Sequence, residues 1–247
     1  MRAVLLAAGL GSRLKPLTDT VPKCLAPICG RPLLAYWLDA LLGDAQMERV
    51  LVNTHHLAGV VEQFVRSSPW SGRIDLAHEP RLLGTAGTLN AHRDWIGGEA
   101  VFVAHADNFT DADPLRLIDA HRRAAPDVVA SLFAFRTPTP RSCGILELDA
   151  RNHVVAFHEK VQDPPGNLAN GAVYVFEPDV LARIAALGCA VCDLSTEVIP
   201  GLLPRVLAVE HTGVFMDIGT PAALAEAQSA LRSARTGLAV ARRPESA

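Results

Sequence analysis

The feature that most constrains the fold is the alternation of short apolar runs with helix-like segments in the first half of the chain. Apolar runs and helical patterns follow one another at 3–8, 33–42, 49–53, 58–65, 74–77, 85–92, 101–104, 114–124 and 128–135. Short apolar strands joined by helical crossovers form a mostly parallel sheet that is buried on both faces. We therefore expect an α/β fold, with a mixed, mostly parallel sheet and helices on both faces.

The second half of the chain has a less regular pattern that is typical of mixed α+β structure. Two apolar runs around a turn at 149–152 predict a hairpin, and Pro178 is placed where a helix can begin. The elements expected here lie at 145–148, 154–158, 172–176, 178–187, just after 194–197, 206–209, 214–216 and from 221 to about 232. We find no internal repeat and no linker-like shift in composition.

Composition excludes several classes of protein. With 247 residues and 49% hydrophobic content, the chain can build a large core. The formal net charge of -3 and the lack of a basic stripe argue against nucleic acid as a partner. The sequence has no run of about 20 apolar residues, so we expect no membrane partner. The apolar run at 3–8 ends in a glycine-rich turn and not in a cleavage site, which predicts a cytoplasmic protein.

The five cysteines predict free thiols. Their number is odd and the chain has no features of secretion, so a disulfide framework is not expected. Cys189 and Cys192 have the C-x-x-C spacing, but no second pair of ligands completes a zinc site. We expect both to be buried structural thiols.

Lysine is rare in this chain. Only three of the 23 basic residues are lysines, at positions 15, 23 and 160. An ammonium group is a compact point charge that suits phosphate binding. Lysines are therefore candidates for phosphate contacts in this chain, although we interpret Lys15 as a loop charge.

A glycine-rich turn, Gly9-Leu10-Gly11-Ser12-Arg13-Leu14, follows directly after the first apolar run. In this position backbone N–H groups can bind phosphate. The turn departs from the dinucleotide fingerprint because Leu14 stands where a third glycine is needed, and it lacks the Gly-Lys-Ser/Thr of the Walker motif. Neither an NAD-binding protein nor a kinase or ATPase is predicted.

The longer stretch has a more specific resemblance. Gly9 to Thr18, followed by Pro22-Lys23-Cys24-Leu25, resembles the G-x-G-x-R-x-x-P-x-T and P-K-x-L signature of nucleotidyltransferases that make nucleotide sugars. Further blocks resemble the same family in the same order: Leu83–Gly87, Asp107, Phe157–Lys160, Asn170-Gly171 and Phe215–Pro221. Together they cover residues 1 to about 230.

The resemblance implies a fold and a domain organisation. It implies the Rossmann-like fold of nucleotide-diphospho-sugar transferases in a single nucleotidyltransferase domain over residues 1–235. The nucleotide-binding half would lie at 1–110 and the sugar-phosphate-binding half at 111–235. We expect residues 236–247 to form a frayed tail.

The resemblance also implies a reaction and a set of site residues. A phosphate oxygen of a sugar 1-phosphate attacks the α-phosphorus of a nucleoside triphosphate, and pyrophosphate leaves. Arg13 and Lys23 would be the catalytic cations, and Asp107 and Asp217 would hold Mg2+. Nucleotide binding is implied for Ala8, Gly9, Gly11, Glu79, Gly84, Thr85 and Gly87, and sugar-phosphate binding for Gly144, Glu159, Lys160 and Asn170.

This reaction needs no general base. The second pKa of a phosphate monoester is about 6, so the nucleophile is already mostly dianionic near neutral pH. The barrier comes from bringing two anionic groups into line while charge builds on the leaving pyrophosphate. Catalysis should therefore depend on positioning and on cations.

Glu79 bears on the choice of base. An ionised carboxylate only accepts hydrogen bonds, so it suits the N1–H and N2–H donors of guanine better than a uracil carbonyl. The turn at Leu83–Gly87 also resembles that of mannose-1-phosphate guanylyltransferases. We favour GTP as the donor. A uridylyl- or thymidylyltransferase stays an alternative, because some short uridylyltransferases carry glutamate here, and a merely solvated Glu79 also stays open.

Two further readings compete with the guanylyltransferase. A non-catalytic homologue that binds a nucleotide sugar and regulates a partner would be expected to lose a metal carboxylate or a phosphate-binding lysine, and this chain keeps them. A phosphocholine acceptor would need a box of aromatic rings, whereas only 5% of this chain is aromatic. The sugar and the oligomeric state stay open.

Overall fold

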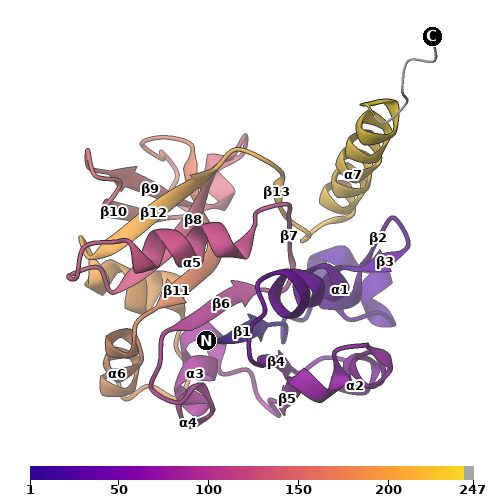
Figure 1. The fold of residues 1–247 in the computed structure, drawn as a ribbon, viewed down its shortest axis with the longest axis horizontal. Helices are drawn as coiled ribbons and strands as arrows, with labels where there is room; N and C mark the ends of the chain where they lie inside the picture. Colours follow the sequence, from indigo (N-terminus) through magenta and orange to yellow (C-terminus); the bar gives the residue numbers. More distant parts are fainter. Residues whose placement is uncertain (242–247) are drawn as a thin grey trace.

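The computed structural model describes residues 1–241, and it describes side chains as far as residue 233. A nine-stranded sheet forms its centre (Figure 1). The strands are β1 (Arg2–Leu6), β4 (Val50–Thr54), β5 (Ile74–His78), β6 (Val101–His105), β8 (Ala130–Arg136), β9 (Gly144–Leu148), β10 (Val154–Glu159), β11 (Leu168–Phe176) and β12 (Val206–His211). Their order is β10-β9-β11-β6-β1-β4-β5, and β8 pairs with both β11 and β12. The β6-β1-β4-β5 part is parallel, whereas β11 runs antiparallel to β6, β8 and β9.

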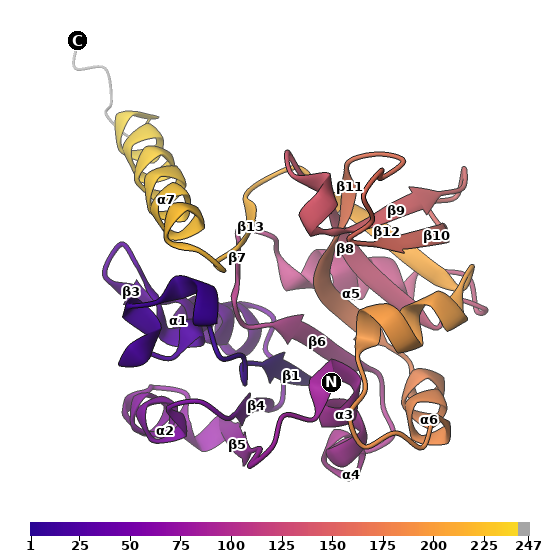
Figure 2. The ribbon, with the colours of Figure 1, turned by 180° about the vertical axis from the view of Figure 1, so that it is seen from behind.

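Helices cover both faces of the sheet (Figures 1 and 2). One face carries α1 (Leu33–Leu38), α2 (Ala58–Ser67) and α5 (Pro114–Arg122), and the other carries α3 (Gly84–Ala91), α4 (Arg93–Ile96) and α6 (Pro178–Ala186). Alternate residues of β1 enter the two cores, since Leu5 packs in the first and Val4 and Leu6 pack in the second. The apolar strands are therefore buried on both sides, as their composition predicts.

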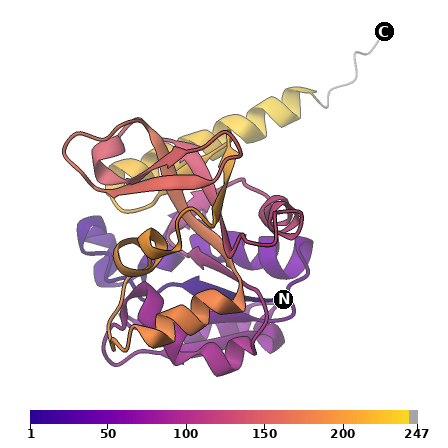
Figure 3. The same cartoon turned by 90° about the vertical axis from the view of Figure 1, so that its left-hand side faces the viewer.

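Two small sheets and a last helix complete the chain: β2 (Pro27–Ile28) with β3 (Arg31–Pro32), β7 (Asn108–Thr110) with β13 (Phe215–Asp217), and α7 (Pro221–Ala241). A third core cluster joins Leu14, Ile28 and Leu33 to Ile218 and to Ala227 of α7. The beginning of α7 therefore packs on the segment after the glycine-rich turn, and its far end projects from the body (Figure 3). No helix in the described part of the chain combines the length and apolar character needed to cross a membrane.

The expected α/β fold class is confirmed, but some boundaries differ. The strand expected at 172–176 begins at Leu168, because β11 pairs with β8 on both sides of an irregularity between Asn170 and Tyr174. The helix expected at 33–42 is α-helical only to Leu38 and continues as a π-helix at Asp39–Asp44. The strands β2, β3 and β7 were not expected, since two or three residues carry no periodic pattern.

The C-terminal expectation was wrong over part of its range. We expected the closing helix to end near residue 232 and a frayed tail over 236–247, but α7 continues to Ala241. Alanine, leucine and arginine favour the helix here, and the first proline after Pro221 is Pro244. Residues 242–247 lie outside the described part of the chain.

We expect Leu5→Ala to lower the free energy of unfolding by about 2–5 kcal/mol, because Leu5 is fully buried and its truncation leaves a cavity. The control Leu76→Ala, at a position of β5 that is 36% exposed, should cost less than about 1.5 kcal/mol. Urea denaturation measures both changes. Equal losses would contradict the central position of β1.

Candidate active site

The site lies where the parallel strands end. β1, β4, β5 and β6 run in one direction, so the segments that follow them meet at one edge of the sheet, which is where ligands bind in open α/β sheets. A cavity of about 200 Å³ opens there. It is lined by Leu6, Ala8, Gly9, Asn53, Glu79, Leu82, Gly84, Thr85, Thr88, His105 and Asp107.

Three charged side chains from distant parts of the sequence meet beside this cavity. Lys23 Nζ donates a hydrogen bond to Asp107, and it also donates to Asp217 Oδ1 at 3.0 Å. Asp107 follows β6, and Asp217 ends β13, whose pairing with β7 places Asp217 opposite Asn108. The N–H of Ile218 donates to the carbonyl of Asp107 at 2.9 Å, which fixes the two backbones side by side.

The charges of this cluster stabilise one another. Burial alone would lower the pKa of Lys23, but the carboxylates of Asp107 and Asp217 outweigh it and raise that pKa above its ordinary value. Burial alone would raise the pKa of Asp107, but Lys23 outweighs it and lowers that pKa. Both carboxylates reach the same cation, and hard carboxylate oxygens suit Mg2+. Asp107 and Asp217 therefore fit a magnesium ion.

Arg13 lies at the edge of this cluster of charges, and Lys160 is near enough to feel the charge of Arg13. Arg13 Nη2 lies 3.5 Å from Asp217 Oδ2. Lys160 Nζ lies 2.9 Å from Glu159 Oε1, and this hydrogen bond raises the pKa of Lys160. The charges of Arg13 and Asp193 also act on Lys160, so the two halves of the chain face one another here.

The remaining residues expected at the sugar phosphate lie on β9, β10 and β11. Gly144 leaves room for Glu159, because a Cβ atom there would lie 2.6 Å from Glu159 Oε2. Asn170 Nδ2 donates to Tyr174 Oη at 2.7 Å, and Asn170 Oδ1 accepts from the N–H of Ala172 at 3.0 Å. The amide of Asn170 therefore also shapes the irregular part of β11.

The structure places the Glu79 carboxylate inside the protein, not in solvent. Glu79 is only 3% exposed. Its Oε1 accepts from Asn53 Nδ2 at 2.8 Å and from Thr88 Oγ1 at 2.6 Å, and its Oε2 accepts from the N–H of Leu83 at 3.1 Å. A carboxylate has about four acceptor positions, so roughly one remains for a ligand in the cavity.

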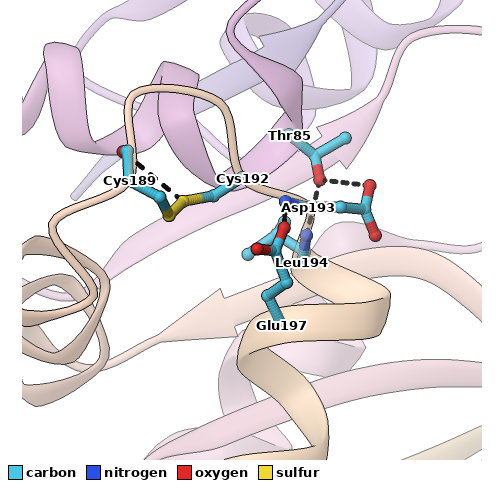
Figure 4. Close-up of a disulfide and its surroundings, with 6 residues drawn as sticks. All are labelled: Thr85, Cys189, Cys192, Asp193, Leu194 and Glu197. Carbon is cyan, nitrogen blue, oxygen red and sulfur yellow. Dashed lines mark hydrogen bonds between the residues drawn. A yellow bond between two sulfur atoms is a disulfide. The ribbon is translucent and has the colours of Figure 1, made fainter.

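Cys192 and Asp193 hold the turn that begins α3, a role that sequence reasoning missed (Figure 4). The carbonyl of Cys192 accepts from the N–H groups of Ala86 and Gly87 at 3.0 and 3.2 Å. Gly84 has φ +74°, and a Cβ atom there would lie 2.3 Å from that carbonyl oxygen, so glycine is required. Asp193 Oδ2 accepts from Thr85 Oγ1 at 3.0 Å.

The expectation of free buried thiols at the C-x-x-C pair was wrong. Cys189 and Cys192 form a disulfide with a Cα–Cα distance of 6.0 Å (Figure 4). Only Cys192 is buried, and Cys189 is partly exposed. The chain between α6 and the helical turn at Leu194–Val198 brings the two sulfurs together, a bend that the spacing alone does not predict.

The structure brings together most of the residues expected at a nucleotide. Of these, Ala8, Gly9, Glu79, Gly84 and Thr85 line the cavity, together with the expected metal ligand Asp107. Gly11, in the left-handed region, precedes the turn that carries Arg13, and Gly87 contacts Cys192. Sequence reasoning missed Asn53, Thr88 and Asp193. A signal existed for Asn53, a polar residue at the end of an apolar parallel strand.

Comparisons with known proteins agree with this geometry. The family model of nucleotidyl transferases matches residues 2–234. A mannose-1-phosphate guanylyltransferase of Mycobacterium tuberculosis is 34% identical over 224 residues, covering 89% of this chain and 61% of that protein. A glucose-1-phosphate thymidylyltransferase of Streptomyces griseus is 30% identical over 187 residues, covering 76% of this chain and 52% of that protein. The chain thus spans only between about half and three fifths of the length of these relatives.

Solved structures show the same fold. UDP-glucose pyrophosphorylase complexed with UDP-glucose has a TM-score of 0.80 at 18% identity, covering 94% of this chain and 98% of that one. HddC from Yersinia pseudotuberculosis complexed with GMP-PN has a TM-score of 0.77 at 22% identity, covering 93% and 99%. With a family model that matches nearly the whole sequence, this chain belongs to the nucleotidyl transferase family.

Proposed function

We propose that this protein transfers a nucleotidyl group from a nucleoside triphosphate to a sugar 1-phosphate and releases pyrophosphate. The observation that carries the proposal is the cluster in which Asp107 and Asp217 converge on Lys23 at the rim of the cavity. Arg13 beside Asp217, and Lys160 within reach of the charge of Arg13, add two more cations near this cluster. The names of the relatives from Mycobacterium tuberculosis and Streptomyces griseus support this class of reaction.

In this proposal the protein's own residues bind and align two anionic reactants. Lys23 and Arg13 neutralise the triphosphate, and Lys160 holds the phosphate of the sugar. Glu159 and Asn170 contact sugar hydroxyls. Asp107 and Asp217 would hold Mg2+, which would supply positive charge for the leaving pyrophosphate. The phosphate nucleophile is already anionic, so these residues orient it and need not remove a proton from it.

We propose GTP as the donor, with a uridylyl or thymidylyl donor as the alternative. The name of the Mycobacterium tuberculosis relative, a mannose-1-phosphate guanylyltransferase, supports guanine. Glu79 has roughly one free acceptor position, so it can accept from N1–H or from N2–H of guanine while it keeps its internal partners. Accepting from both donors would require the loss of one internal hydrogen bond. In this proposal, Glu79 therefore favours guanine through a single hydrogen bond.

We expect pyrophosphate release in the presence of Mg2+ with GTP and a manno-configured sugar 1-phosphate. The measurement compares GTP, UTP, dTTP, CTP and ATP against hexose, hexosamine and heptose 1-phosphates. Turnover only with UTP or dTTP would contradict the guanine preference and keep the reaction class. No pyrophosphate release with any pair of substrates would contradict the proposed reaction and favour the non-catalytic homologue.

Asp107→Asn and Asp217→Asn should each lower kcat/KM by about 100-fold or more, because each removes a carboxylate that would hold the Mg2+ whose positive charge stabilises the leaving pyrophosphate. They should also weaken Mn2+ binding, measured by calorimetry as a probe of the metal site. Asp163→Asn, at a side chain that is 97% exposed, is the control and should change neither quantity. Normal activity in either site variant would contradict the metal assignment.

Lys23→Met should destabilise the metal-free protein at neutral pH by about 1–3 kcal/mol, because it leaves Asp107 without its cation. In the wild type the folded pKa of Asp107 is lowered, so its stabilising effect is present at neutral pH and is lost only at strongly acid pH. Without Lys23, burial raises that pKa, so the penalty should shrink as the pH falls.

Urea denaturation at about pH 7.5 and about pH 5 measures this difference. The control is Lys15→Met, because Lys15 is 62% exposed and pairs with Asp19 at the surface. That substitution should cost less than about 0.5 kcal/mol at both pH values. A penalty for Lys23→Met that grows on acidification would contradict the charge assignment.

A further inference from the structure

The side chain of Asn53 joins two segments of the nucleotide site that are far apart in the sequence. Asn53 lies in β4, beside Leu6 of β1 and Ala77 of β5, and is only 4% exposed. Its Oδ1 accepts from the N–H of Ala7 at 2.6 Å. Its Nδ2 donates to Glu79 Oε1 at 2.8 Å. One buried amide therefore joins Ala7, two residues before the glycine-rich turn, to the carboxylate of Glu79.

These partners require a side chain at position 53 that both accepts and donates a hydrogen bond, as an amide does. A backbone N–H can only donate and an ionised carboxylate can only accept, so the side chain between Ala7 and Glu79 must offer one acceptor and one donor. Aspartate would place a second carboxylate against Glu79. An aliphatic residue would remove one hydrogen bond from the N–H of Ala7 and one from the carboxylate of Glu79. The same requirement settles which end of the amide faces which partner.

The hydrogen bonds continue from Glu79 into the turn that begins α3. Glu79 Oε2 accepts from the N–H of Leu83 at 3.1 Å. Thr88 Oγ1 lies 3.1 Å from Asn53 Nδ2 and 3.0 Å from the carbonyl oxygen of Gly84. Asn53, Glu79 and Thr88 all line the cavity and are all buried. A continuous polar chain thus runs from the phosphate side of the cavity to the base side.

We propose that Asn53 is a positioning residue that couples the phosphate-binding loop to the base-binding turn. The proposal rests on the proposed function, in which the glycine-rich turn binds phosphate and Leu83–Gly87 binds the base. Asn53 and Thr88 occupy Oε1 of Glu79, which leaves the free acceptor position on Oε2 beside the turn. A base that fits this acceptor keeps the chain of hydrogen bonds intact, and a base that displaces Glu79 disturbs Asn53 and its bond to Ala7.

The coupling is tested first without catalysis. Guanosine, uridine and thymidine are titrated into the protein by calorimetry with and without pyrophosphate and Mg2+, and the tightest-binding nucleoside is used. The coupling ratio is the Kd of the nucleoside without pyrophosphate divided by its Kd with pyrophosphate. We expect a coupling ratio of about five or more in the wild type and of about one in Asn53→Ala. No ratio in the wild type, or an unchanged ratio in Asn53→Ala, would overturn the proposal.

A second variant separates positioning from a general loss of structure. Asn53→Asp keeps the shape of the side chain but faces Glu79 with a like charge, so the two carboxylates should share a proton at acid pH. The protonated aspartate can again donate to Glu79. We expect the coupling ratio of Asn53→Asp to be lost at about pH 8 and restored at about pH 5. A ratio that stays lost at both pH values in a folded variant would overturn the proposal.

Other titrating groups must be separated from this effect. His105 and Asp107 line the same cavity, and His55 Nδ1 lies 2.7 Å from the carbonyl oxygen of Glu79. The wild type and Asn167→Ala, at an exposed asparagine, are therefore measured at both pH values and should keep their ratio. Urea denaturation verifies that each variant is folded. If Asn53→Ala does not fold, the coupling ratio is measured in Thr88→Val, which removes a hydroxyl that contacts both Asn53 and Glu79. An unchanged coupling ratio in Thr88→Val overturns the proposal.

Kinetics then distinguish this inference from the proposed function. With the best donor, Asn53→Ala should lower kcat/KM by about 10- to 100-fold, and it should lower kcat/KM less with the poorer bases, so discrimination falls. An equal loss with every base would overturn the coupling. If the wild type turns over no substrate pair but shows the coupling ratio, the proposed function fails and the role of Asn53 in binding stands.

Discussion

The parallel pairing of β1 with β4 on one side and β6 on the other is the constraint on which the site depends. Because both faces of these strands are buried under helices, polar groups are confined to the strand ends, where backbone N–H groups are free to meet a ligand. The segments after the four parallel strands therefore share one edge. Asn53, Glu79 and Asp107 become neighbours through this pairing.

Charge balance links this edge to the rest of the chain. Lys23 is nearly buried, and an unpaired ammonium there would be costly. Asp107 comes from the centre of the sheet and Asp217 from the short strand before α7, so one lysine ties three parts of the chain together. The same pair of carboxylates can serve a divalent cation. A structural ion pair and a metal site therefore use the same atoms in this protein, and stability and activity are linked there.

The sequence predicted the parallel sheet, the helices on both faces and most of the residues that line the cavity. These features depend on apolar runs and on local motifs such as the turn at Gly9–Arg13, which a sequence displays directly. It did not predict the environment of Glu79. From the sequence this residue looked free to accept two donors from guanine, but three of its acceptor positions are taken by Asn53, Thr88 and Leu83. Such partners depend on the register between strands.

The sequence by itself determined the order of strands and helices, the phosphate-type turn and the family signature, because each is encoded in contiguous residues. Only the tertiary structure decided which side chains meet. Three contacts join segments that are far apart in the chain. Cys192 binds the turn at Gly84, the amide of Asn53 binds both Ala7 and Glu79, and Lys23 binds both Asp107 and Asp217. Strand pairing and packing create these contacts, and no local pattern of residues encodes them.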